Sequence, residues 1–154
     1  PVSTAMGAYF NKKAYTDPTL RRKYTRMGFW VNIRLIRYPD VLLMAAESAN
    51  EKGLMGEASG YLEQVRAHAR GTLTNVLPKV ESLDQSVLRE AIRHERRVEL
   101  GLEPDRFYDL VRWGIAQEVL QAAGKNYQPK NALLPLPQTE IDKSNGVLVQ
   151  NPDY

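Results

Sequence analysis

Apolar residues recur at helical spacing through the middle of the chain. Ala58, Leu62, Val65 and Ala69 stand at i, i+4, i+7 and i+11, which places them on one side of a helix. The same periodicity, with proline and glycine as start and stop signals, predicts helices over residues 39–52, 56–69, 84–102 and 104–114 and a further helical stretch over 115–123. We therefore expect a mainly α fold whose helices occupy residues 32–125.

The first two predicted helices form the clearest pair. Residues 41–46 are apolar on nearly every face of the first helix, which should make that helix central. Gly53 allows only a short turn before the second helix, so the two helices must be antiparallel neighbours. Such a pair is typical of a tetratricopeptide hairpin, although many other antiparallel helix pairs also use alanines at their contact. The small residues that would let the backbones approach closely are Ala45, Ala46, Ala49 and Ala58.

The two ends of the chain differ from its middle. Residues 1–31 read as an irregular segment that is rich in aromatic residues. Prolines in residues 126–154 prevent a long helix there, and residues 133–137 (LLPLP) read as extended. We expect an extended, Pro-rich C-terminal tail that packs on the tetratricopeptide-like antiparallel helix pairs, because so many leucines would not remain in water.

Composition places the chain among folded globular domains. It has 154 residues, 43% hydrophobic and 25% charged, so we expect a single domain over residues 1–154. No apolar run approaches 18 residues, and there is no cysteine for a disulfide or a metal site. The net charge of +3 comes from interleaved signs, which does not favour a nucleic-acid partner.

The beginning of the chain does not read as a signal peptide. It lacks a basic start followed by a long apolar run. Because the sequence opens on Pro1, we expect it to be a fragment or a processed product.

Two carboxylates stand out on the third predicted helix. Glu95 and Glu99 share its apolar stripe at i and i+4, a spacing that could serve the acid and the nucleophile of a retaining glycosidase. A buried carboxylate needs a partner, however, and arginines stand nearby in the sequence. We expect a structural ion network that locks the third helix to the fourth. Its expected members are Glu95, Arg96, Glu99, Arg106, Asp109 and Arg112.

Five stretches of the chain resemble the SusD/RagB family, in the family's order. Two lie on the predicted helix pair, at 37–47 (RYPDVLLMAAE) and 65–67 (VRA). The more specific ones follow at 91–114, with AIRHERRVEL and RFYDLVRWG, and at 134–141 (LPLPQTEI) and 150–154 (QNPDY). The resemblance runs from about residue 7 to residue 154. It departs from the family pattern at Glu63, His68 and Pro104.

The resemblance implies a binding protein and no enzyme. Members of this family are longer lipoproteins, anchored by a lipid on the surface of the outer membrane. They capture oligosaccharides and pass them to a SusC-like TonB-dependent transporter. This chain would then be the C-terminal part, with mainly a scaffold and partner-contact role and no cofactor.

Aromatic residues near the beginning are candidates for ligand contact. Trp30, Tyr24 and Tyr15 could form a platform on which sugar rings stack, or they could pack a loop onto the helices. The basic run over residues 21–26 is typical of a solvated loop. The two histidines, His68 and His94, lack the spacing of metal ligands.

Two other functions remain open from the sequence. A tetratricopeptide-like adaptor would need a concave face lined by the first two helices, with residues 39–52 exposed along one side. A glycoside hydrolase would need Glu95 and Glu99 open to a cleft.

Overall fold

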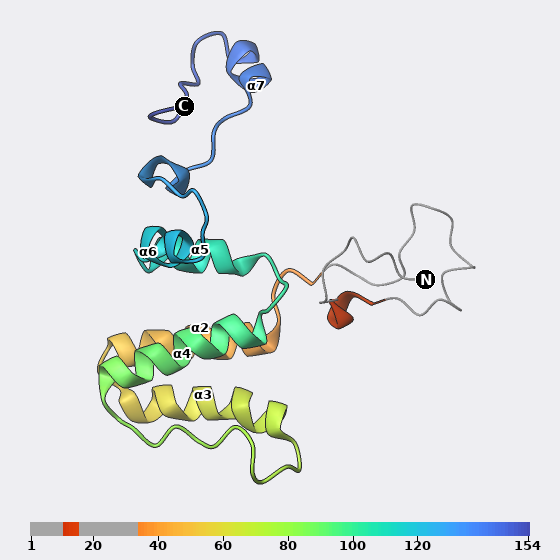
Figure 1. Ribbon diagram of the computed structural model, residues 1–154, viewed down its shortest axis with the longest axis vertical. Coiled ribbons are helices and arrows are strands. Elements are labelled where there is room, and N and C mark those ends of the chain that lie inside the picture. Colours follow the sequence, from red (N-terminus) through yellow and green to blue (C-terminus); the bar gives the residue numbers. More distant parts are fainter. Residues whose placement is uncertain (1–10, 16–33) are drawn as a thin grey trace, which may run out of the picture. The chain divides into compact units, whose positions relative to one another are not determined.

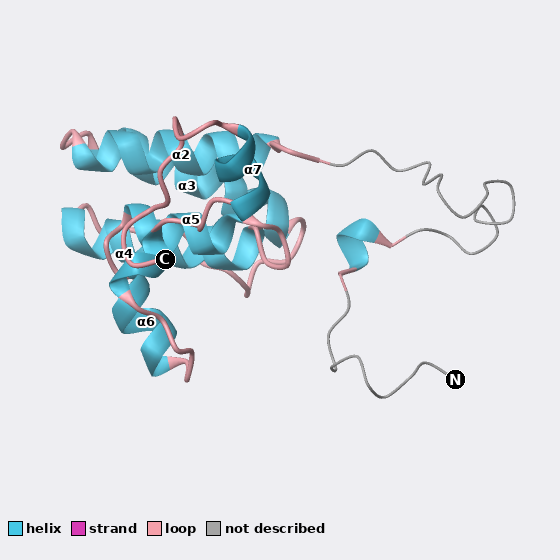
Figure 2. Cartoon of the chain, turned by 90° about the horizontal axis from the view of Figure 1, so that it is seen from above, coloured by secondary structure: helices cyan, strands magenta, loops and turns pink. Residues whose placement is uncertain are grey.

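A computed structural model describes residues 11–15 and 34–154 of the chain. Within these ranges the chain consists of helices and loops, with no strand (Figure 2). The described residues divide into two compact units, one up to Leu102 and the other from Glu103 to Tyr154. The mainly α class is therefore confirmed, while the tetratricopeptide-like detail stays a prediction.

Among its described residues, the first unit contains three long helices, which Figure 1 labels. These are α2 (Tyr38–Glu51), α3 (Met55–Arg70) and α4 (Gln85–Glu99), and each contacts the other two. A turn of 3-10 helix, η1 (Lys12–Ala14), precedes them. The predicted bounds of α2 and α3 are correct to within one residue at each end.

Local signals in the sequence explain the ends of these helices. Pro39 stands in the first turn of α2, where a missing N–H costs nothing. Gly53 ends the turn after α2 with φ +78°, a left-handed conformation that suits glycine. The carboxylate of Asp84 caps α4 by accepting from the backbone N–H of Ser86 and Val87, at 2.9 and 3.0 Å. α4 ends at Glu99, three residues before the predicted end.

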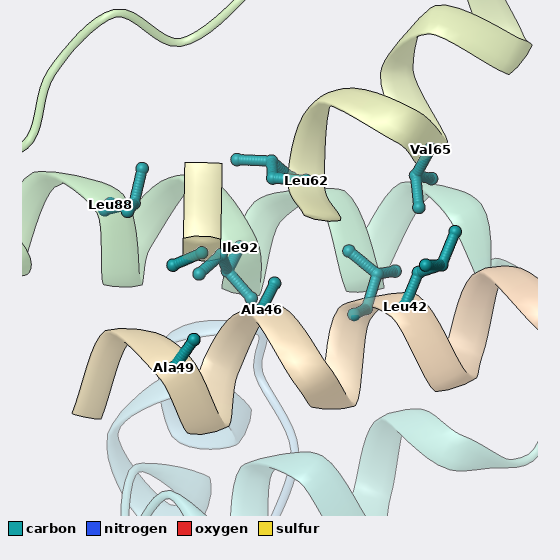
Figure 3. Packing of buried hydrophobic residues seen from close by; sticks show 9 residues of the cluster. Leu42, Ala46, Ala49, Leu62, Val65, Leu88 and Ile92 are labelled. Atoms are coloured by element: carbon teal, nitrogen blue, oxygen red, sulfur yellow. The ribbon is translucent and has the colours of Figure 1, made fainter. Parts of the chain in front are cut away.

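The core of the first unit lies where α2, α3 and α4 meet. Small residues lie in the core that α2 and α3 share: Ala46 and Ala58 are both fully buried. Small side chains at this position allow two helix backbones to approach closely. Figure 3 shows the larger side chains of the core pointing toward one another. The buried apolar residues of this core are Leu42, Leu43, Ala46, Ala49, Ala58, Leu62, Val65, Leu88 and Ile92.

One expectation about α2 is wrong. The run 41–46 suggested burial on nearly every face, but Val41 and Met44 are 44% and 42% exposed, and Tyr38 is exposed as well. α3 and α4 cover only one side of α2, because both pack on the face that carries Leu42 and Ala46. We call Tyr38, Val41 and Met44 the open face of α2.

The long loop between α3 and α4 is fastened by side chains of α3. Ser59 Oγ donates to the carbonyl of Val80 at 3.2 Å. Arg70 donates from Nε to the carbonyl of Leu77 at 2.9 Å, and its Nη1 lies 2.9 Å from Glu63 Oε1. Because the bonds from Ser59 Oγ and Arg70 Nε end on backbone carbonyls of the loop, they fix its path whatever its side chains.

The second unit has a smaller core. It contains α5 (Asp105–Arg112) and α6 (Ala116–Ala122), joined through Gly114 at φ +72°. Leu110, Ala116 and Tyr127 are its buried apolar residues, and the rings of Phe107 and Tyr127 lie 6.4 Å apart.

The tail is less extended than we expected. A 3-10 helix, η2 (Pro129–Ala132), and a short helix, α7 (Gln138–Lys143), interrupt it. Residues 133–137 between them are extended, as predicted. The prolines exclude long helices but not these, because Pro129 and Pro137 stand at or before a first helical turn, where no N–H is needed.

Candidate functional site

The most conspicuous polar group of the first unit is a buried ion pair between α3 and α4. Arg66 Nη1 lies 2.6 Å from Glu95 Oε2, and the two side chains are 12% and 4% exposed. Arg66 also donates from Nε and Nη2 to the carbonyl of Pro78, at 3.3 and 2.9 Å. One guanidinium therefore joins α3, α4 and the loop between them.

A second buried pair joins α4 to α2. Arg96 Nη1 lies 2.8 Å from Asp40 Oδ1, and both residues are buried. Asp40 stands in the first turn of α2, where a negative charge also complements the helix dipole. Arg96 and Glu95, adjacent in the sequence, thus anchor α4 to two different neighbours.

A third pair lies at the C-terminal end of α4. Arg37 donates from Nη1 to Glu99 Oε1 at 2.8 Å and from Nη2 to the carbonyl of Glu99 at 2.9 Å. Lys13 Nζ donates to the same carbonyl, and Asn11 Nδ2 donates to the carbonyl of Leu102 at 3.1 Å. Cationic donors are favourable here because the last carbonyls of a helix have no intrahelical partner. Together, Glu95–Arg66, Arg96–Asp40 and Glu99–Arg37 form what we call the α4 ion-pair network.

The other end of α4 is joined to α2 by an exposed pair. Arg89 donates from Nε and Nη2 to the two carboxylate oxygens of Glu51, at 2.6 and 2.7 Å. The hydrogen bond from Arg89 lowers the pKa of Glu51 below its usual value. Gln85 Nε2 donates to the carbonyl of Asn50 at 2.7 Å, and Asn50 Nδ2 donates back to the carbonyl of Gln85 at 3.1 Å.

The expected members of the network beyond α4 lie in the second unit. There, Arg112 Nη2 is 2.9 Å from Asp109 Oδ1, one helical turn apart on α5. The guanidinium carbons of Arg112 and Arg106 stand 4.9 and 5.9 Å from the centre of the Trp113 ring. We also expected Arg106 or Arg112 to form an ion pair with Glu95 or Glu99, and this stays a prediction.

Sequence reasoning missed three partners of α4. Arg66, Arg37 and Asp40 are 29, 62 and 56 residues from the side chains that they bind. Sequence spacing identifies neighbours within one helix, and these contacts depend on how separate helices pack. The only available signal was that Arg37, Asp40 and Arg66 stand in the two strings that resembled the SusD/RagB family.

Comparisons with known proteins agree on one family. The sequence model of the SusD family matches residues 2–154. The chain is 39% identical over 124 residues to SusD-like protein P25 of Formosa agariphila. This alignment covers 76% of this chain and 23% of that protein. SusD-like protein P2 of the same organism is 36% identical over 127 residues, covering 77% of this chain and 25% of that protein. The chain belongs to the SusD family.

A solved structure supports the fold. The chain superposes with a TM-score of 0.70 on a SusD homologue from Bacteroides thetaiotaomicron, at 30% identity, over 86% of this chain and 30% of that one. The chain thus spans about a quarter of the length of the curated SusD-like relatives that it matches.

The residues proposed for ligand contact are only partly described. Tyr15 follows η1 and is 60% exposed. Tyr24 and Trp30 lie outside the described residues. For this SusD-family chain, a glycan platform formed by these three aromatics therefore stays a prediction.

The chemistry available to the α4 ion-pair network is limited. Glu95 is hydrogen-bonded to a guanidinium and excluded from water, so its carboxylate has no room for a substrate. In the part of the chain that the structure describes, no three histidine, aspartate or glutamate side chains gather as metal ligands would. The network is suited to holding helices together.

Proposed function

We propose that the protein is a non-catalytic, cell-surface oligosaccharide-binding protein that works with a SusC-like TonB-dependent transporter in nutrient uptake. Membership of the SusD family supports this over the length of the chain. Because the chain spans about a quarter of its relatives, we assign it mainly a scaffold and partner-contact role. Ligand capture would rest largely on the rest of such a protein.

The α4 ion-pair network is the observation that best supports the scaffold role. It uses charged side chains to join α4 to α2, to α3 and to the loop between α3 and α4. A bidentate or multiply bonded arginine restricts the angle between the elements that it joins. A rigid frame of this kind would hold ligand-binding segments at fixed positions.

The burial of Glu95 argues against a glycoside hydrolase. A retaining enzyme needs one carboxyl as acid and the other as nucleophile, both in contact with the sugar. Glu95 is 4% exposed and paired with Arg66, and Glu99 is paired with Arg37.

Binding and hydrolysis measured on the intact protein would test the proposal. An oligosaccharide array followed by calorimetry should identify a bound glycan, and product analysis after prolonged incubation should find that glycan unchanged. Cleavage of the bound glycan would refute the non-catalytic function, and the absence of binding to any glycan would refute carbohydrate capture.

The open face of α2 favours one alternative, a tetratricopeptide-like adaptor. Tyr38, Val41 and Met44 lie on one side of the helix and are exposed. A partner helix could bind such a stripe through contacts at i and i+3. Val41→Glu should abolish capture of such a partner. Under the glycan-binding proposal it should leave glycan affinity unchanged.

We propose a location on the outer membrane, held by a lipid anchor outside this sequence. The family supports this location. No helix among the described residues is long and apolar enough to cross a membrane.

A further inference from the structure

The tail of the second unit is ordered without an apolar core of its own. After Tyr127, none of the residues 128–154 is buried. Leu133 and Leu134 are 53% and 62% exposed, and Val147 is more exposed still. Burial of apolar surface, the main favourable term in folding, is therefore small here, and other contacts must fix the path of the chain.

Gln150 supplies the central contact. Its Oε1 accepts from the backbone N–H of Leu136 at 2.8 Å, and its Nε2 donates to the carbonyl of Leu136 at 2.9 Å. The side-chain amide thus satisfies both backbone groups of one residue, as a neighbouring strand would. The same Oε1 accepts from the N–H of Asn151 at 3.0 Å, which orients the amide.

The residues after Gln150 continue along the same extended segment. Asn151 Nδ2 donates to the carbonyl of Leu134 at 2.6 Å, and the hydroxyl of Tyr154 donates to the carbonyl of Leu133 at 3.0 Å. Three side chains of the last five residues therefore bind backbone groups of residues 133–136. None of these bonds uses a side chain of the segment that is bound.

Two side chains of η2 also contact Tyr154 and the residue before it. Asn131 Nδ2 donates to the hydroxyl of Tyr154 at 3.1 Å. Lys130 Nζ lies 4.9 Å from the centre of the Tyr154 ring, within the range of a cation–π contact, and donates to the carbonyl of Asp153 at 2.8 Å.

Two turns direct the end of the chain to this place. Asn145 and Gly146 both have positive φ, +52° and +84°, and the N–H of Val147 bonds the carbonyl of Ser144 at 3.2 Å, which reverses the chain after α7. A second turn places Asp153 at φ +66°. Aspartate tolerates this left-handed conformation better than most residues do.

We propose that residues 130–136 form a binding site for the chain's own C-terminal pentapeptide, Gln-Asn-Pro-Asp-Tyr, and that this pentapeptide is the strap that orders the tail. The ligand class is a peptide with amide side chains at its first two positions and a phenol at its last. Recognition depends on those side chains, on the backbone of residues 133–136 and on the side chains of Lys130 and Asn131. It does not depend on the exposed leucines.

Hydrogen exchange at the Leu136 amide of the intact protein tests the strap. Gln150→Leu removes both bonds to Leu136 at nearly constant volume. The Leu136 N–H then loses its one acceptor, so its exchange should become about tenfold faster, as expected for one lost hydrogen bond. Gln117→Leu is the matched control, because Gln117 is an exposed glutamine of α6. It should leave the exchange of Leu136 unchanged.

A milder variant covers the case in which Gln150→Leu disturbs the whole unit. Tyr154→Phe removes one hydroxyl, which accepts from Asn131 and donates to Leu133. It should accelerate exchange at Leu136 about two- to fivefold, while the amides of α5 and α6 exchange as before. Unchanged exchange at Leu136 in both variants and after deletion of residues 150–154 would overturn the proposal.

Discussion

At the scale of single residues, the pairing of Glu95 with Arg66 is the contact whose loss should matter most. Both side chains are largely removed from water, and Arg66 has its remaining donors on the carbonyl of Pro78. A buried pair of this kind adds little compared with apolar residues of the same shape. Removing one partner is costly, because the other charge then stays buried without compensation.

Glu95→Gln should therefore lower the free energy of unfolding by about 3–5 kcal/mol. The change keeps the shape of the side chain and leaves the Arg66 guanidinium without its counter-charge. Urea unfolding followed by circular dichroism measures the loss. Glu90→Gln on the same helix is the control, because the Glu90 side chain is 73% exposed in its pair with Arg93. This substitution should lower the free energy of unfolding by less than about 1 kcal/mol. An equal loss of unfolding free energy in the two variants would contradict a structural role for the buried Glu95–Arg66 pair.

The cap of α4 gives a prediction about pH. The hydroxyl of Ser86 and the backbone N–H groups of Val87 and Ser86 lower the pKa of Asp84 below its usual value. A carboxyl whose pKa is lower in the folded state contributes stability above its unfolded pKa, about 3.9, and loses that contribution as the pH falls through the folded pKa. Hydrogen-exchange protection of the first turn of α4 should therefore decline on acidification below about pH 4.

Asp84→Asn separates this effect from general acid unfolding. Asparagine caps a helix about as well as aspartate but does not titrate in this range. Protection at Ser86 and Val87 in the variant should fall less steeply with acidification than in the parent chain. The same slope in both proteins would mean that the Asp84 carboxylate does not stabilise the cap.

At the scale of helices, the close approach of α2 and α3 depends on small residues. Ala58 is fully buried at the contact, whereas Ala69, on the same sequence stripe, is exposed near the end of α3. Ala58→Leu should destabilise the first unit by about 1–3 kcal/mol because the added atoms force the helices apart. Ala69→Leu adds the same atoms where there is room. Thermal unfolding of both variants measures the difference, and similar midpoints would mean that the contact is looser than described.

The sequence predicted what is local to each helix. Asp84 as a cap, Gly53 as a stop and the α2–α3 hairpin follow from short-range rules of capping and turns. The sequence could not show which face of α2 would stay open, because a helix that is apolar all round carries no information about which neighbours will cover it. Val41 and Leu42 look alike in the sequence, and only the packing of α3 and α4 distinguishes them.

The same limit explains the candidate site. Burial of Glu95 followed from its place on an apolar stripe, but its partner depends on the side of α4 against which α3 packs. The strap was missed for a related reason. Hydrogen bonds from Gln150, Asn151 and Tyr154 to backbone groups leave no pattern in the bound segment, because any residue type offers the same carbonyl.

At the scale of the whole molecule, a scaffold and a catalytic site predict different results from the same substitution. If Glu95 only holds α4 to α3, its loss changes how much protein is folded and leaves the ligand site of the folded protein intact. If Glu95 contacted sugar, its loss would change binding or turnover directly. The intact protein with Glu95→Gln therefore distinguishes the two functions.

We expect the folded fraction of this variant to bind its glycan with a Kd within about twofold of the parent, a change of about 0.4 kcal/mol or less. Calorimetry at a temperature well below the unfolding midpoint, with the active concentration taken from the fitted stoichiometry, separates affinity from folded fraction. Glu90→Gln again serves as the control, because it changes the same charge on an exposed face of α4. A tenfold weaker Kd for Glu95→Gln alone would place Glu95 in ligand binding. A residue that only holds α4 to α3 should not change the glycan affinity of those molecules that are folded.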